Sequence, residues 1–214
     1  FYERALYNHI LSTIDPVQGG FVYFTSMRPG HYKVYSQPQT SFWCCVGSGM
    51  ENHARYGEMI YGHESDKTLY VNLFIPSTLK WDDVELELKT RFPDDNSIVL
   101  RIDPERRKLF TVKIRVPEWT NGEEVKLSIN GNSVLRPDIS DGYLSITSNW
   151  RKGDEVRLEL PMSLRVMQLP DSSSNWSFLY GPLVLASRMG VERLDGLFAD
   201  DSRNGHIASG PKLP

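Results

Sequence analysis

The sequence has 214 residues, and 24 Lys and Arg against 27 Asp and Glu give it a formal net charge of −3. This near balance disfavours a generic nucleic-acid binder and a polybasic protein of membrane surfaces. No apolar run reaches the roughly 18 residues of a membrane-spanning helix, and 40% hydrophobic residues indicate a globular chain. The chain opens at Phe1 without a signal peptide, within a helix-like pattern. We therefore expect a fragment of a longer protein, and the pattern leaves its compartment open.

Residues 1–14 carry an apolar stripe at helical spacing, which includes Leu6 and Ile10. Asp15-Pro16 ends this helix, because the residue before a proline is driven out of the helical region. Residues 19–24 then read as a short extended segment after a turn.

A second helix is predicted after the adjacent cysteines Cys44 and Cys45. Ser48 and Glu51 have the spacing of a capping box, so we expect the helix to begin at Ser48. Gly62 is a natural residue for its C-terminal end. The cysteines would then lie just upstream of a helix N-terminus, where the partial positive charge stabilises a thiolate.

From residue 68 the apolar period changes from 3.6 to 2, which is typical of half-buried strands. Strands are predicted over 69–75, 84–88, 98–102, 109–116, 125–130, 133–135, 143–147, 155–160, 164–169 and 178–187. Asn130-Gly131 is the strongest hairpin signal. The core-facing side chains should be Leu69, Val71, Val84, Leu86, Val112 and Ile114. The fold class is therefore mainly β, an antiparallel β-sandwich that helices precede.

Three interpretations of the cysteine pair stay open from the residues alone. The thiols could be buried as small hydrophobic groups, form a strained vicinal disulfide, or act as a functional thiolate site that serves as nucleophile, metal ligand or both. Zinc needs three or four protein ligands, and His31, His53 and His63 show no convincing ligand spacing relative to Cys44 and Cys45.

Residues 42–57 (Phe-Trp-Cys-Cys-Val-Gly-Ser-Gly-Met-Glu-Asn-His-Ala-Arg-Tyr-Gly) resemble the cysteine-pair motif of the β-L-arabinofuranosidases of glycoside hydrolase families 127 and 146. The version here is closer to that of family 146. Downstream motifs agree with the resemblance in the right order, among them residues 69–74, 114–119, 129–131, 153–156, 160–162 and 180–184. This resemblance implies that residues 1–64 are the last helices of an (α/α)6 catalytic barrel. Residues 65–165 would form one β-sandwich, and residues 166–214 would begin a second one that is cut short.

The resemblance also implies a retaining glycoside hydrolase that releases β-L-arabinofuranose from plant glycans. Cys44 would be both nucleophile and zinc ligand, Cys45 a zinc ligand, and Tyr23 a contact to the substrate. The family's Glu-x-Cys pair of further zinc ligands and its acid/base glutamate would lie upstream of Phe1.

The fragment alone is then expected to be inactive and to bind zinc weakly. Its partner would be an arabinose-containing oligosaccharide or polysaccharide, with neither nucleic acid nor membrane. Self-association is expected through the apolar faces of the helices (Leu6, Ile10, Met50 and Ile60). A periplasmic or secreted location in a polysaccharide-degrading bacterium is suggested by the resemblance only. The alternative is a non-catalytic carbohydrate-binding or structural β-sandwich module with an inert thiol pair.

Overall fold

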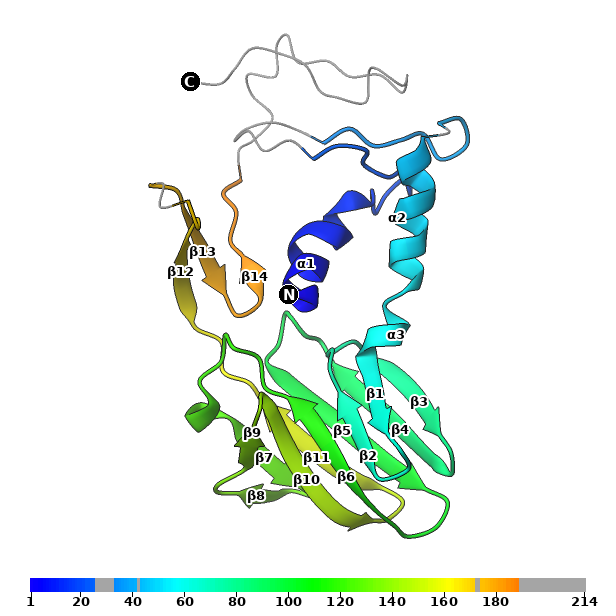
Figure 1. Ribbon diagram of the computed structural model, residues 1–214, viewed down its shortest axis with the longest axis vertical. Helices are drawn as coiled ribbons and strands as arrows, with labels where there is room; N and C mark the ends of the chain where they lie inside the picture. Colours follow the sequence, from blue (N-terminus) through cyan, green and yellow to red (C-terminus); the bar gives the residue numbers. More distant parts are fainter. Residues whose placement is uncertain (26–32, 42, 172–173, 189–214) are drawn as a thin grey trace. The chain divides into compact units, whose positions relative to one another are not determined.

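The computed structural model describes residues 1–25, 33–41, 43–171 and 174–188 (Figure 1). The chain divides into two compact units. The first unit contains residues 1–56 and 185–214, and the second contains residues 57–184. The first carries the helices around the cysteine pair, and the second carries the sheets.

The predicted N-terminal helix is present, but its turns are of three kinds. It consists of α1 (Tyr2–Ala5), the π-helix η1 (Leu6–Ile10) and the 3-10 helix η2 (Leu11–Thr13). Ile14 is extended, so the helix ends before Asp15-Pro16 as the sequence predicts. Leu6 is buried at 2% exposure, whereas Leu11 is exposed. The apolar stripe therefore has one buried side chain at its centre.

The second helix, α2 (Cys44–Ala54), starts four residues earlier than the capping box predicts. Trp43 is its N-cap residue, with an extended backbone and no side-chain hydrogen bond to the helix. The predicted capping box at Ser48 is therefore wrong, because Ser48 lies inside the helix. Gly62 does not end the helix either. It lies in strand β1, after the short helix α3 (Gly57–Ile60).

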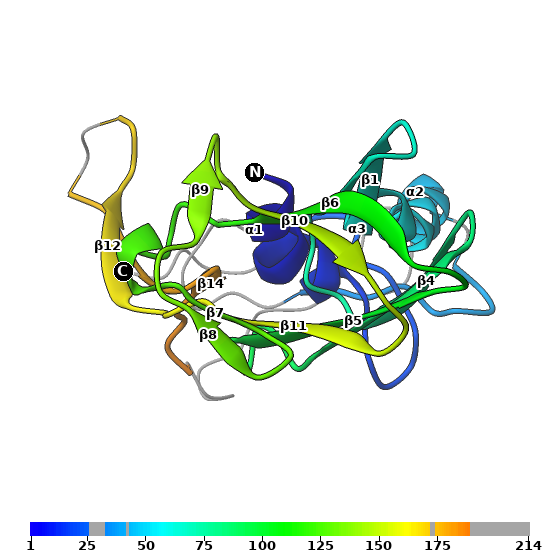
Figure 2. The same cartoon turned by 90° about the horizontal axis from the view of Figure 1, so that it is seen from below.

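The second unit is built on two facing sheets, and Figure 2 shows them as two layers. The first sheet has the order β1-β2-β6-β10-β9. Its strands are β1 (Tyr61–Glu64), β2 (Thr68–Val71), β6 (Lys108–Arg115), β9 (Asp138–Ser140) and β10 (Tyr143–Trp150). All its neighbours are antiparallel except β2 and β6, which run parallel. The expected antiparallel sandwich thus contains one parallel pair.

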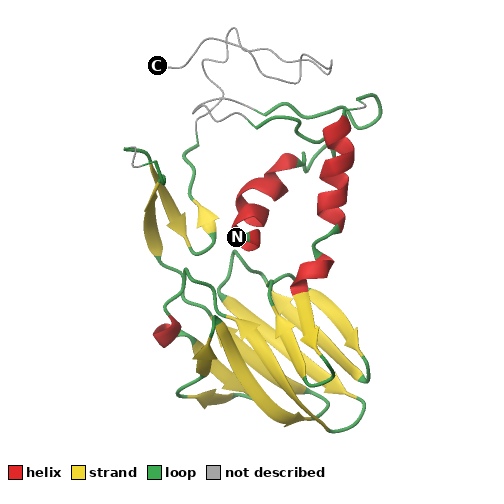
Figure 3. Ribbon diagram, viewed as in Figure 1, coloured by secondary structure: helices red, strands yellow, loops and turns green. Residues whose placement is uncertain are grey.

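The second sheet has the order β3-β4-β5-β11-β7-β8, and all its neighbours are antiparallel. Its strands are β3 (Ser77–Trp81), β4 (Val84–Thr90), β5 (Ser97–Pro104), β7 (Lys126–Ile129), β8 (Asn132–Val134) and β11 (Asp154–Glu159). The 3-10 helix η3 (Gly122–Glu124) precedes β7. Figure 3 shows that strands form nearly all of the regular structure of this unit.

The core lies between these two sheets. The six residues predicted to face it are all at most 2% exposed (Leu69, Val71, Val84, Leu86, Val112 and Ile114). Aromatic contacts join the layers, since the ring centroids of Trp81 and Phe110 lie 5.3 Å apart. The period-2 alternation in the sequence therefore identifies the inner faces correctly.

Two tight turns carry the hairpins on the edge strands. Asn130 and Gly131 have φ angles of 52° and 77°, which confirms the predicted Asn-Gly hairpin between β7 and β8. Asp141 and Gly142 have φ angles of 51° and 77° and connect β9 to β10 in the same way. Asp141-Gly142 is also a hairpin signal, but β9 was not among the predicted strands.

A third, smaller antiparallel sheet contains β12 (Leu164–Gln168), β13 (Trp176–Tyr180) and β14 (Leu183–Val184). One of its faces is apolar and exposed, because paired residues at alternate positions are all about half exposed (Leu164, Val166, Trp176, Phe178 and Tyr180). Self-association of this chain stays a prediction. Among the described residues, no helix combines the length and the apolar character that a membrane span needs.

Candidate functional site

The cysteine pair forms the first turn of helix α2. Both thiols are free, Cys44 is exposed and Cys45 is half-buried. The two sulfur atoms lie 4.0 Å apart, about twice the length of a disulfide bond. The structure therefore forms no vicinal disulfide, and the interpretation as two buried thiols does not hold for Cys44.

Tyr23 faces the exposed thiol. Its hydroxyl oxygen lies 3.8 Å from Cys44 Sγ, within hydrogen-bond distance for sulfur. The neutral thiol can donate to that oxygen, and the ionised thiolate can accept from the hydroxyl. This hydrogen bond is the main cause that lowers the pKa of Cys44, followed by the contact with Cys45 and with the backbone amides at the helix start. Burial and the neighbouring sulfur raise the pKa of Cys45. The pair is therefore asymmetric: the pKa of Cys44 is lowered and that of Cys45 is raised.

The sequence predicts an extended segment over residues 19–24. Phe21 and Val22 form isolated β-bridges to Ile14 and Tyr35, and the chain bends at Tyr23. Phe21 in this segment exchanges two hydrogen bonds with Ser36, one from its N–H to Ser36 Oγ at 2.9 Å and one from Ser36 N–H to its carbonyl at 2.9 Å. The Tyr23 ring meets the Trp43 ring edge to face, with centroids 6.3 Å apart. The hydroxyl is thus placed by its own segment and by the N-cap residue of α2.

The other candidate ligands lie elsewhere. His31 is outside the described residues. His53 is on α2, where its Nδ1 lies 2.6 Å from the Tyr56 hydroxyl and its ring packs against Phe21. Burial lowers the pKa of His53, so the neutral ring is favoured. His63 lies on β1, and its Nδ1 is 3.3 Å from the carbonyl oxygen of Ser65.

The two sulfurs fit one edge of a zinc site. Two thiolates on a tetrahedral zinc lie about 3.8 Å apart, given a Zn–S bond of about 2.3 Å, and the sulfurs here are separated by 4.0 Å. Within the described ranges no group of three or more His, Cys, Asp or Glu side chains could hold a metal ion. The described residues thus offer two soft sulfur ligands at one edge of a tetrahedral site, and zinc would need further ligands.

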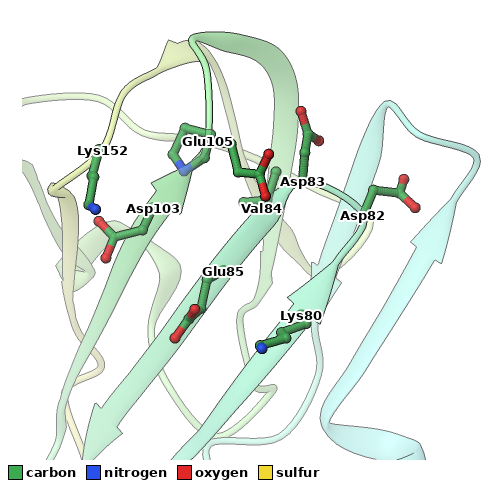
Figure 4. Close-up of a pocket in the computed structure, with 9 residues that line it drawn as sticks. Lys80, Asp82, Asp83, Val84, Glu85, Asp103, Glu105 and Lys152 are labelled. Carbon is green, nitrogen blue, oxygen red and sulfur yellow. The ribbon is translucent and has the colours of Figure 1, made fainter.

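A polar pocket of about 340 Å³ lies at the end of the second sheet, between the β3–β4 turn and the end of β5 (Figure 4). Its acidic side chains are partly neutralised within the fold. Asp83 forms an ion pair with Lys108, which lowers the pKa of Asp83. Asp103 pairs with Arg101 at 3.1 Å and accepts a hydrogen bond from the Gly153 N–H at 2.6 Å. These interactions stabilise three turns, and we assign the pocket no catalytic or binding role.

Sequence reasoning missed two residues that hold the site together. Phe21 and Ser36 give no catalytic signal, because they are an aromatic and a serine in irregular sequence. Both Phe21 and Tyr23 contact helix α2, Phe21 at Gly49 and Tyr23 at Cys44, and no local pattern in the sequence marks these contacts.

Comparison with known proteins adds the family. Residues 1–58 match the model of the GH127 β-L-arabinofuranosidase catalytic domain, and residues 68–162 match that of the GH127 middle domain. Residues 165–214 match a domain of unknown function. No curated protein matches the chain. The expected boundaries at residues 64 and 165 stay a prediction.

Solved structures agree with these matches. A GH127 β-L-arabinofuranosidase from Geobacillus stearothermophilus T6 is 29% identical with a TM-score of 0.68, over 85% of this chain and 31% of that one. Another structure, described as a GH127 β-arabinofuranosidase, is 28% identical with a TM-score of 0.68, over 85% of this chain and 32% of that one. A glycoside hydrolase at 22% identity, with a TM-score of 0.69 over 85% and 32% of the two chains, shows the same fold. The chain thus spans about a third of the length of these structures. With two domain models of one family matched in order, this chain belongs to the GH127 β-L-arabinofuranosidases.

Proposed function

We propose that this chain is part of a retaining glycoside hydrolase that releases β-L-arabinofuranose from arabinose-containing glycans, with Cys44 as its nucleophile. The observation that supports this most is the asymmetry of the cysteine pair. Cys44 is exposed at the start of α2, and its pKa is lowered by the Tyr23 hydroxyl. Cys45 is half-buried, and its pKa is raised. An accessible thiol with a lowered pKa is what a cysteine nucleophile needs, because the thiolate is the reactive form.

The reaction would proceed by double displacement. The Cys44 thiolate attacks the anomeric carbon of the arabinofuranoside, the bond from that carbon to the leaving oxygen breaks, and a carboxylic acid protonates the oxygen. Water then attacks the same carbon, the conjugate carboxylate takes its proton, and the sulfur leaves as thiolate. We propose that the acid/base residue lies outside residues 1–214, as the resemblance implies.

Tyr23 has two roles in this proposal. Its hydroxyl donates to the Cys44 thiolate before attack and after release of the sugar, which stabilises both charged states of the sulfur. We also propose that Tyr23 contacts the substrate, since its ring lies beside the thiol that must reach the anomeric carbon.

We further propose that Cys44 and Cys45 are two of the ligands of a zinc ion. Their sulfurs are soft donors at the separation of one tetrahedral edge. Bound zinc would keep the thiols deprotonated at neutral pH. Cys45 fits the role of holding ligand, because its half-buried sulfur is less accessible to a substrate than that of Cys44.

Exchange of each cysteine for serine in the longer enzyme tests this assignment. Cys44→Ser should abolish turnover of a chromogenic β-L-arabinofuranoside, because a serine hydroxyl is hardly ionised near pH 7. Ser48→Ala is a matched control on the same helix, and it should keep wild-type turnover. Near-wild-type activity of Cys44→Ser would contradict the proposal and favour a structural thiol pair.

A further inference from the structure

We infer that Gly49 is a positioning residue, which sets the Tyr23 hydroxyl against Cys44 by admitting the Phe21 ring onto helix α2. The inference deepens the proposed function and rests on it for its catalytic meaning. The geometry behind it involves only residues of the first unit.

The Phe21 ring occupies the space where a side chain at position 49 would stand. A Cβ atom added to Gly49 would lie 2.5 Å from Phe21 Cδ1 and 3.1 Å from both Cε1 and Cγ. Phe21 is 8% exposed, and its ring also meets the His53 ring at a centroid distance of 5.6 Å. Gly49 and His53 are four residues apart and share a helix face. Phe21 is therefore seated in a shallow site made by this face.

The spacing of residues along the two elements explains how the packing of Phe21 on Gly49 positions the Tyr23 side chain. Phe21 and Tyr23 are two residues apart, so their backbones can be at most about 7 Å apart. Cys44 and Gly49 are five residues apart on α2, a rise of about 7.5 Å along the helix axis. With the Phe21 ring on Gly49, the two-residue step to Tyr23 is long enough to reach Cys44, and the Tyr23 hydroxyl lies 3.8 Å from the Cys44 sulfur.

The segment has little room to yield if a side chain is added at Gly49. Two hydrogen bonds of 2.9 Å fix Phe21 to Ser36 on the side of the neighbouring strand segment. A side chain at Gly20 would clash with the Ser36 carbonyl, which shows how closely the two backbones approach. Because the backbone at Phe21 is held, a methyl group at position 49 must turn the Phe21 ring out of its place. The strain then falls on the residues that follow Phe21, among them Tyr23.

The chain supplies a matched control on the same helix. Gly47 lies two residues before Gly49, and a Cβ added there has nothing within 4 Å. Both exchanges to alanine raise the helix propensity of α2 equally. Only Gly49→Ala places an atom against the Phe21 ring. A difference between the two variants therefore reports the packing of Phe21 on Gly49 rather than a change in helix propensity.

The test is the rate at which iodoacetamide alkylates Cys44 in the metal-free 214-residue chain, with the modified residue assigned by tandem mass spectrometry. Gly49→Ala should slow alkylation about threefold at pH 7, the effect of losing one modest hydrogen bond. Gly47→Ala should leave the rate unchanged. Tyr23→Phe should slow it similarly, and Gly49→Ala should add nothing in the Tyr23→Phe background.

Phe21→Val removes the ring that packs on Gly49, so it should slow alkylation to a similar extent, and Gly49→Ala should add little in that background. The Phe21→Val variant also carries the test if Gly49→Ala alone does not fold. A wild-type rate in folded Gly49→Ala or Phe21→Val, or an equal further loss from Gly49→Ala in the Tyr23→Phe background, would overturn the inference. Alkylation requires no turnover, so a failure of the proposed glycosidase function would appear separately, as an inactive longer enzyme with these rate differences intact.

Discussion

Trp150 gives the sharpest prediction for the stability of the sandwich. It ends strand β10, is 0% exposed, and its indole N–H donates to the Phe110 carbonyl at 3.0 Å. The Trp150→Phe exchange keeps an aromatic ring in the core, removes the donor, and leaves space where the larger ring was.

Two contributions set the expected loss. A buried hydrogen bond that loses its donor costs about 1 to 3 kcal/mol, with the upper end for a carbonyl left unpaired. The unfilled volume adds about 1 kcal/mol if the core relaxes only in part. We therefore expect Trp150→Phe to lower the free energy of unfolding of the sandwich by about 2 to 4 kcal/mol.

Amide hydrogen exchange of β6 and β10 measures this directly, because their slowest amides report the opening of the unit that contains residues 57–184. Trp176→Phe on β13 is the control, since Trp176 is 56% exposed. Its effect should stay within about 0.5 kcal/mol. A loss below about 1 kcal/mol in Trp150→Phe would refute the reasoning that the hydrogen bond to Phe110 matters.

Three further predictions concern the first unit. Burial lowers the pKa of His53, so the unfolded chain binds more protons near the ordinary histidine pKa of about 6.5. The stability of α2 should therefore be full above pH 6.5 and fall as the pH drops through the lowered pKa of His53. Amide hydrogen exchange of α2, corrected for the pH dependence of the intrinsic exchange rate, measures this. The same pH dependence of the protection in His53→Asn would contradict the prediction. Cys45→Ser in the longer enzyme should weaken zinc binding and reduce activity, which zinc titration checks, and unchanged affinity would remove Cys45 from the ligand set. The 214-residue chain alone should bind zinc weakly and leave a chromogenic arabinofuranoside intact, whereas stoichiometric tight zinc with turnover would show a complete site within it.

The inner faces of the sandwich could be predicted from the sequence, because apolar and polar residues alternate along its strands. Leu86 and Leu88 between charged neighbours identify an inner face without any knowledge of the partner strand. The parallel pairing of β2 with β6 could not be predicted in this way, because it depends on the long connection between them. Asp141-Gly142 carried a local hairpin signal, so β9 was within reach of the sequence.

The start of helix α2 shows where local signals fail. Ser48 and Glu51 have the spacing of a cap, yet the helix begins at Cys44. Glycines at 47 and 49 disfavour a helix locally, and the packing of Phe21 on Gly49 is a contact that only the folded chain reveals. The same tertiary contact places Tyr23 at the thiol. The motif therefore predicts the chemistry of the cysteine pair, and the fold supplies its geometry.

The measurement that tests the central claim most directly is the identity of the residue that carries the sugar during turnover. The longer enzyme would be acid-quenched while it hydrolyses a β-L-arabinofuranoside with an activated leaving group, and its peptides analysed by mass spectrometry. We predict a pentosyl thioether on Cys44 that is absent from the Cys44→Ser variant. A pentosyl ester on a carboxylate, with Cys44 unmodified, would contradict the assignment of Cys44 as the nucleophile.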